Sequence, residues 1–193
     1  MTAISSLAVF CGSRVGTNPA YAESARVLGS GLARAGIRLV FGGGRIGIMG
    51  VVADAVLAGG GEVLGVIPEF LTKWEVAHDR VTELVVTDSM HTRKQRMYEE
   101  SDAFLIMPGG LGTFDEALEI ITWRQLRLHD KPIFLCNVAG WAGPLIAAIE
   151  HAIAQGFASP ASLDLFEVID GVPALLDRLR LVPAGAEGSA DRL

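Results

Sequence analysis

Glycines, a hydroxyl and a carboxylate follow one another in the segment Pro108–Glu116, the strongest chemical signal in the chain. Backbone without side chains lets a ligand come close, and the segment supplies three such positions, Gly109, Gly110 and Gly112. Thr113 adds a hydroxyl, and Glu116 adds a carboxylate three residues later. These residue types suit a site that binds an anion on backbone N–H groups with a carboxylate beside it.

Two predicted elements hold this segment in place. Ala103–Ile106 is an unbroken apolar run, which indicates a buried strand, and Ala117–Trp123 has the pattern of a helix. The first N–H groups of a helix have no partner inside it, and the helix dipole adds partial positive charge at that end. A strand–glycine turn–helix junction therefore predicts binding of a phosphate or carboxylate.

The same residues allow an interpretation without chemistry. Thr113–Glu116 has the spacing of a capping box, in which Thr and Glu side chains satisfy free donors at a helix start. Asp115 and Glu119 are then simply first-turn acids that the helix dipole favours. Because a cap does not need the preceding glycines, the anion site is the favoured prediction. A catalytic role for Glu116 stays open at this point.

A second group of candidates lies in Met90–Met97. Helical spacing places Met90, Arg93, Lys94 and Met97 on one face. Such a face could flank a flat apolar ring while its cations reach an anion. The pattern alone favours the alternative, an ordinary amphipathic helix whose cations extend into solvent.

Other motifs carry less weight. Gly42, Gly44 and Gly47 match the dinucleotide pattern G-x-G-x-x-G, but they follow the second predicted strand, and a glycine-rich chain produces such matches by chance. The sequence contains no P-loop, no H-E-x-x-H, and no metal-ligand spacing at Cys11 and Cys136. We therefore expect neither a metal nor a cofactor.

Composition limits the class of protein. The chain has 193 residues, 50% of them hydrophobic, and 23 glycines, which suits one α/β domain over residues 1–182, with a disordered tail over 183–193. The net charge of −6, without a block of Lys or Arg, argues against nucleic-acid binding. We find no signal peptide and no apolar run long enough for a membrane span, and we expect reduced, buried cysteines. These features predict a cytoplasmic protein.

Apolar runs that alternate with helical patterns predict the architecture. Strands are expected near residues 7–11, 37–41, 63–67, 81–86, 103–106, 132–136 and 166–169, with helices between them and an irregular, mobile loop over 69–79. This alternation predicts an α/β fold, a Rossmann-like doubly wound parallel sheet with helices on both faces. Ligands bind such sheets where the strand order reverses, here between the first strand and Ala103–Ile106. Gly12–Arg14 and Pro108–Thr113 would then face one crevice.

At this point the motifs carry a resemblance. Pro108–Glu116 is similar to the PGGxGTxxE signature of the LOG ("lonely guy") family, and Met90–Lys94 resembles its second motif, MHxRK. Members are cytokinin riboside 5′-monophosphate phosphoribohydrolases, often labelled lysine decarboxylases. Shorter segments are also similar to the family: Cys11–Ser13, Gly42–Gly50, Gly65–Pro68, Ile121–Trp123 and His129–Pro132. Ile48 stands where the family usually has Leu, and the loop over 69–80 diverges.

The resemblance implies a role for particular residues. Glu116 and Arg93 match the catalytic positions. The positions that match the 5′-phosphate cradle, with Ser13 nearby, are Gly109, Gly110, Gly112 and Thr113. Positions that match or approximate substrate contacts are Met90, Lys94 and Glu75. The implied reaction is hydrolysis of the N-glycosidic bond of AMP or an N⁶-modified AMP, in a homodimer whose active site lies at or near the interface.

Two other classes of function are weighed against this one. A nucleotide-binding or sensor module could use the same crevice without turnover, although the presence of both Glu116 and Arg93 favours an enzyme. A decarboxylase would ordinarily need a pyridoxal phosphate lysine with supporting partners. The sequence offers no such group around its three lysines, Lys73, Lys94 and Lys131.

Overall fold

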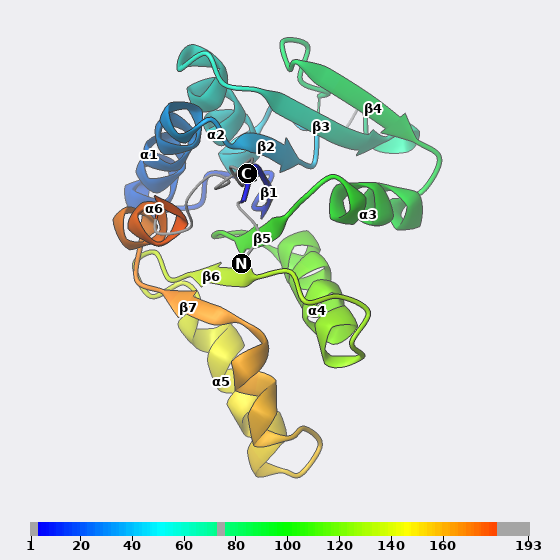
Figure 1. The fold of residues 1–193 in the computed structure, drawn as a ribbon, viewed down its shortest axis with the longest axis vertical. Helices are drawn as coiled ribbons and strands as arrows, with labels where there is room; N and C mark the ends of the chain where they lie inside the picture. Colours follow the sequence, from blue (N-terminus) through cyan, green and yellow to red (C-terminus); the bar gives the residue numbers. More distant parts are fainter. Residues whose placement is uncertain (1–3, 73–75, 181–193) are drawn as a thin grey trace, which may run out of the picture.

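The computed structural model describes residues 4–72 and 76–180, so the predicted tail over 183–193 lies outside the described residues. Seven strands form one parallel sheet in the order β4-β3-β2-β1-β5-β6-β7 (Figure 1). The strands are β1 (Ser6–Phe10), β2 (Arg38–Phe41), β3 (Val63–Pro68), β4 (Glu83–Thr87), β5 (Ala103–Ile106), β6 (Ile133–Cys136) and β7 (Glu167–Ile169). The predicted Rossmann-like doubly wound sheet is confirmed, with the reversal of order between β1 and β5.

Helices connect most successive strands, and α6 follows the last one. They are α1 (Pro19–Ala35), α2 (Gly47–Ala58), α3 (Met90–Glu99), α4 (Leu111–Gln125), α5 (Gly143–Ala154) and α6 (Val172–Arg180). Short 3₁₀ helices cover Glu69–Leu71 and Pro160–Leu165. Within the described ranges, none of the helices is both long and apolar enough to cross a membrane.

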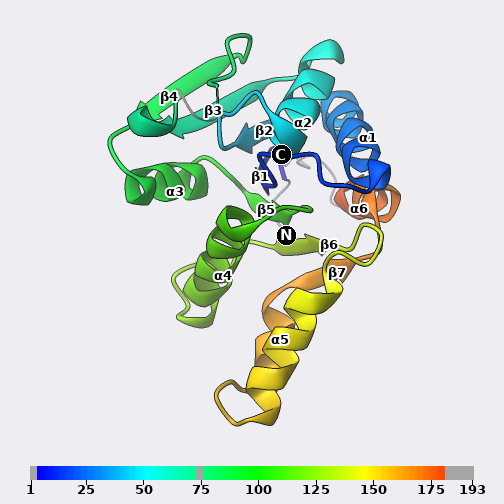
Figure 2. The same cartoon turned by 180° about the vertical axis from the view of Figure 1, so that it is seen from behind.

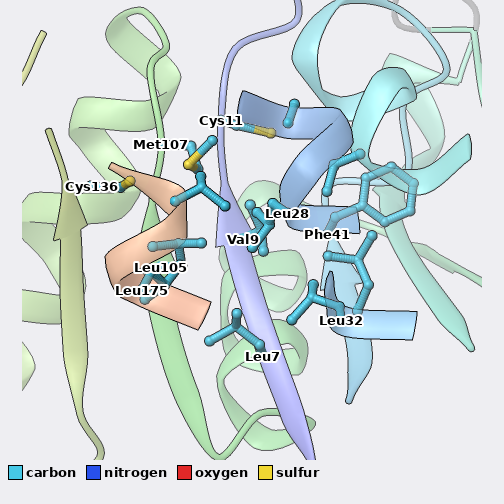
Figure 3. Packing of buried hydrophobic residues seen from close by; sticks show 14 of the residues in the cluster. Leu7, Val9, Cys11, Leu28, Leu32, Phe41, Leu105, Met107, Cys136 and Leu175 are labelled. Atoms are coloured by element: carbon cyan, nitrogen blue, oxygen red, sulfur yellow. The ribbon is translucent and has the colours of Figure 1, made fainter. Parts of the chain in front are cut away.

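The helices divide between the two faces of the sheet because strand side chains alternate in direction (Figure 2). Leu7 and Val9 of β1 point to the face covered by α1, α2 and α6, where they pack with Leu28 of α1 (Figure 3). Ala8 and Phe10 belong to the opposite core, which α3, α4 and α5 cover. Both faces of the central strands are buried, as a parallel sheet requires.

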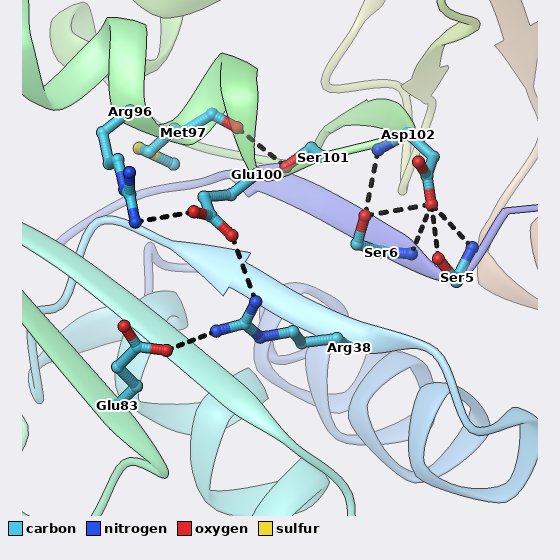
Figure 4. Close-up of polar contacts among 9 residues, drawn as sticks. All are labelled: Ser5, Ser6, Arg38, Glu83, Arg96, Met97, Glu100, Ser101 and Asp102. Atoms are coloured by element: carbon cyan, nitrogen blue, oxygen red, sulfur yellow. Dashed lines mark hydrogen bonds and ion pairs between the residues drawn. The ribbon is translucent and has the colours of Figure 1, made fainter.

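Polar contacts fix the amino ends of the central strands (Figure 4). The Asp102 carboxylate, just before β5, accepts hydrogen bonds from the backbone and hydroxyl groups of Ser5 and Ser6 at 2.7–3.0 Å. Arg38 of β2 pairs with Glu83 of β4 at 2.6 Å and with Glu100, at the end of α3, at 3.2 Å. The Asp102 hydrogen bonds thus join the start of β1 to the start of β5, the two strands between which the sheet changes order.

Candidate active site

A cleft of about 610 Å³ opens at the carboxyl ends of β1 and β5. Residues from both predicted turns line it, among them Gly12, Ser13, Gly110 and Leu111. The same four residues also line an adjoining cavity of about 130 Å³, which contains Arg93, Gly112, Thr113 and Glu116. The two predicted turns therefore do face one crevice, and the predicted anion turn and both predicted catalytic residues share a cavity.

The turn before α4 is held from two sides. The Gly12 N–H donates to the Pro108 carbonyl at 3.0 Å, and Trp141 Nε1 donates to the Gly109 carbonyl at 3.2 Å. A Cβ on Gly109 would overlap the Thr113 side chain and lie 2.8 Å from the backbone nitrogen of Gly12. A Cβ on Gly110 or Gly112, in contrast, would meet nothing within 4 Å. Gly109 therefore serves packing, whereas Gly110 and Gly112 leave backbone open to a ligand.

The alternative interpretation of Thr113–Glu116 as a capping box is wrong. Helix α4 begins at Leu111, so Thr113 and Glu116 lie inside it, and the N-cap is Gly110, which has no side chain to offer. Asp115 and Glu119 also lie beyond the first turn, and they pair with Lys94. Because no side chain caps α4, its first N–H groups are available to an anion. Glu116 stands between one and two turns deeper, inside the cavity.

Arg93 is buried rather than extended into solvent, so the interpretation of its helix as an ordinary solvent-facing one is wrong at this position. Ser89 caps α3 with Thr92 in a capping box, and this fixes the helix start one turn before Arg93. The guanidinium donates from Nε to the Val66 carbonyl and from Nη2 to the Gly42 carbonyl, both at 3.1 Å. Carbonyls at the ends of β2 and β3 thus orient the group.

Arg93 and Glu116 form an ion pair across the cavity. Arg93 Nη1 lies 3.6 Å from Glu116 Oε1, and the side chains are 6% and 8% exposed. Charges this deeply buried are costly unless they are paired, and here each group offsets the charge of the other. The cavity therefore contains a carboxylate and a guanidinium, both oriented before any ligand arrives.

Sequence reasoning missed the role of Gly42. A Cβ there would overlap Nη2 of Arg93 and lie 3.0 Å from Met49 Sδ, so only glycine leaves room for the guanidinium. Gly47, at φ +68°, packs directly on the backbone of Ser13 and Arg14. Packing thus explains these glycines of the G-x-G-x-x-G match without a dinucleotide. No local signal marks Gly42, because its partner lies in a distant helix.

The remaining predicted site residues fall in different places. Ser13 lines both the cleft and the cavity, and Met90 Sδ lies 3.8 Å from Arg93 Nη1. The Lys94 ammonium is 3.1 Å from Asp115 and 3.0 Å from Glu119. Partial burial opposes its charge, but hydrogen bonds to these carboxylates outweigh that and raise the pKa of Lys94. Glu75 lies outside the described residues.

Metal binding finds no support in the part of the chain that the structure describes. No group of three or more His, Cys, Asp or Glu side chains there is placed to hold an ion. Cys11 and Cys136 are both buried, and burial raises the pKa of the Cys136 thiol to about 12.

Comparison with known proteins identifies relatives across most of the chain. A family described as "possible lysine decarboxylase" matches residues 49–179. A cytokinin riboside 5′-monophosphate phosphoribohydrolase of Rhodococcoides fascians is 47% identical over 158 residues, which are 81% of this chain and 80% of that protein. An Arabidopsis thaliana protein of the same name is 42% identical over 173 residues, covering 90% of this chain and 81% of that one.

Solved structures share the fold at lower identity. The molybdenum cofactor binding protein of Rippkaea orientalis aligns with a TM-score of 0.70 and 20% identity, over 94% of this chain and 98% of that one. The molybdenum cofactor carrier protein of Chlamydomonas reinhardtii aligns at 0.67 and 19%, over 96% and 100%. These similarities support the architecture alone. The sequence relatives and the family match decide membership: the chain belongs to the LOG family of cytokinin riboside 5′-monophosphate phosphoribohydrolases.

Proposed function

We propose that this protein hydrolyses the N-glycosidic bond of AMP or an N⁶-modified AMP, releasing the free base and ribose 5-phosphate. The observation that carries the proposal is the shared cavity. A buried Arg93–Glu116 pair opens onto the same space as the uncapped start of α4. A phosphate at the helix start and a sugar beside the carboxylate would occupy neighbouring parts of it.

The 5′-phosphate would lie on the backbone N–H groups at the start of α4. Gly110 and Gly112 expose the N-terminal turn of α4, Thr113 adds its hydroxyl, Gly109 holds the turn and Ser13 faces it across the cleft. Helix N–H groups and the helix dipole favour a dianion at that point. Binding energy from the phosphate then positions the sugar, which makes a nucleoside without phosphate a poor substrate.

Glu116 and Arg93 would carry the chemistry. As the C1′–N bond breaks, positive charge develops on the ribose ring and negative charge moves onto the departing base. The Glu116 carboxylate stabilises the ring cation and orients or deprotonates the attacking water. The Arg93 guanidinium offsets negative charge on the base or holds the sugar and phosphate. Terms of this kind contribute on the order of 10²–10⁴ each in rate.

The substrate contacts and the assembly are also proposals. By resemblance to the family, Met90, Lys94 and Glu75 contact substrate, and two copies form a homodimer with the active site near the interface. Apolar residues of the larger cleft, such as Ile48 and Trp141, suit a flat base. We also propose a cytoplasmic location, where the two buried cysteines would stay reduced.

Incubation of the purified protein with AMP, isopentenyl-AMP and adenosine, followed by an assay for released base and ribose 5-phosphate, tests the proposal. We expect release from the two nucleotides and little from adenosine. Glu116→Gln should lower turnover on the order of 10²–10⁴-fold and still bind AMP, because the phosphate site is untouched. If neither nucleotide is cleaved but both bind, the protein is a nucleotide-binding module and not this enzyme.

A further inference from the structure

Three residues form a clasp between α3 and α4, beside the catalytic pair. The Lys94 ammonium reaches from α3 to Asp115 and Glu119 of α4, at 3.1 and 3.0 Å. Lys94 follows Arg93 directly in the chain, and Asp115 precedes Glu116. One end of the clasp is therefore covalently next to the catalytic guanidinium, and the other is next to the catalytic carboxylate.

The surroundings of the clasp favour an interaction within the protein over a contact with substrate. The Lys94 side chain is only 15% exposed, whereas Asp115 and Glu119 are 58% and 26% exposed. Two carboxylates already occupy two of the three N–H donors of the ammonium and offset its charge, so Lys94 is satisfied without a ligand. Among the described residues, those that line the large cleft and the cavity of Arg93 and Glu116 do not include Lys94.

The clasp is one of the contacts that join α3 to α4, together with the Arg93–Glu116 pair and the edge-on packing of Tyr98 on Trp123. Arg93 is anchored to carbonyls of Gly42 and Val66, on the β2–β3 side of the sheet. Glu116 belongs to α4, which follows β5 on the other side of β1. The distance between the two catalytic groups therefore depends on how α3 sits against α4, and the clasp joins those helices at the level of the pair.

We propose that Lys94 is a positioning residue: its ion pairs with Asp115 and Glu119 fix α3 against α4 and so hold Arg93 at its working distance from Glu116. This inference rests on the proposed hydrolase function. It reassigns Lys94 from a direct substrate contact to a residue that acts through Arg93 and Glu116. Rates depend steeply on such distances, and a displacement of about 1 Å can cost on the order of 100-fold.

Steady-state kinetics with AMP separate the two roles. Lys94→Met keeps most of the side-chain length without its charge, and Asp115→Asn combined with Glu119→Gln removes the partners. We expect each variant to lower kcat about 10- to 100-fold, with KM changed less than about threefold. The triple variant should be no worse than either, because all three changes break one unit. Lys94→Arg, which can still pair with both acids, should recover much of the rate.

A matched control and a second measurement keep the test decisive. Arg26→Met breaks the exposed Arg26–Glu23 pair on α1, at 2.9 Å, and should leave kcat and KM unchanged. Hydrogen exchange of α3 amides should accelerate in Lys94→Met relative to this control, since the helix loses one of its contacts with α4. Thermal unfolding of each variant verifies that the fold persists.

Each contrary result has its own meaning. A raised KM with unchanged kcat in Lys94→Met, together with normal kinetics in the Asp115/Glu119 variant, would make Lys94 a substrate contact and overturn the proposal. Unaltered kinetics in all variants would show that these ion pairs do not affect catalysis and would overturn the proposal. If the native protein releases no ribose 5-phosphate, the hydrolase function fails; an unchanged exchange rate of α3 would then refute the clasp as well.

Discussion

At the scale of single residues, the glycines around the cleft have separate functions. Gly109 and Gly42 are surrounded by protein atoms that a Cβ would strike, whereas Gly112 faces open space. The sequence alone presents all of them as one glycine-rich class. Only the fold shows which glycines have protein atoms next to the missing Cβ, and so serve packing, and which face open space for a ligand.

Replacing Gly112 by Val should weaken AMP binding without harming the fold. The new side chain would stand in the open space beside the first turn of α4, where the phosphate is proposed to lie. We expect the Kd for AMP to rise by about tenfold or more, as expected when a 1–2 kcal/mol interaction is lost. Calorimetric titration measures this. Gly109→Ala, in contrast, should lower the melting temperature, and equal Kd values for native and Gly112→Val protein would place the anion elsewhere.

Replacing Gly42 by Ala should impair catalysis through Arg93. The added Cβ overlaps Nη2, so the guanidinium must leave the Gly42 carbonyl and shift relative to Glu116. A displacement near 1 Å predicts a fall in kcat on the order of 100-fold. Gly143→Ala is the matched control, because a Cβ there meets nothing within 4 Å. If the Gly42→Ala enzyme keeps the native kcat, Arg93 can shift its position without loss of catalysis.

At the scale of elements, the sequence predicts boundaries well where they depend on local chemistry. Local residues set both ends of α1: the Asn18 side chain accepts from the Ala20 N–H at 3.0 Å, and Gly36 takes the left-handed conformation. The start of α4 was misplaced, because the capping-box spacing of Thr113 and Glu116 competes with a glycine N-cap. Tertiary contacts decide between those two local solutions.

The hydrogen bonds of Asp102, which join the start of β1 to the start of β5, also depend on pH. Partial burial disfavours the Asp102 carboxylate, but hydrogen bonds from Ser5 and Ser6 outweigh this, and the pKa of Asp102 falls below its ordinary 3.8. A lowered pKa in the folded state means a contribution present above pH 3.8 that is lost as the pH falls through the lower folded value.

Asp102→Asn should therefore reduce the free energy of unfolding at neutral pH by about 1–2 kcal/mol. The difference between native and variant protein should shrink as the pH falls below 3.8 and through the lowered folded pKa of Asp102, where the native carboxylate also becomes neutral. Urea titrations at several pH values measure both quantities. If the difference in unfolding free energy between native and variant protein stays constant with pH, the charge of Asp102 contributes nothing to stability.

At the scale of the whole molecule, three exposed leucines lie along one side of α4 and its C-cap, beside the exposed Asp115 and Thr122. Leu111, Leu118 and Leu126 are 87%, 46% and 63% exposed, and their spacing of seven and eight residues places them on one side of the helix. Leu111 also lines the cleft, so this face is continuous with the site. A second copy seated there would put the proposed dimer interface beside the nucleotide.

Leu118→Glu should convert the proposed dimer to a monomer, because it places a charge within an apolar contact. Light scattering coupled to size-exclusion chromatography measures the mass directly. Leu118→Met keeps an apolar side chain and should remain dimeric. If Leu118→Glu still has the mass of a dimer, the interface lies on another face of the molecule.

The sequence predicts the fold and the residues that line the site, but it does not predict how those residues are arranged. Alternating strands and helices predict the sheet and its crevice, and the motifs around Arg93 and Glu116 predict the chemistry. The carbonyls that hold Arg93 and the acids that hold Lys94 come from elements distant in the chain. No period or spacing records such long-range pairs.

The space above Gly42 has a consequence for protein design. A guanidinium can occupy that position only if the turn after β2 contributes no side chain, even though the turn and the arginine are fifty-one residues apart. If only the two signature motifs were grafted onto another parallel-sheet scaffold, the arginine would therefore not be held in its catalytic orientation. A working graft must include the receiving turn as its third component.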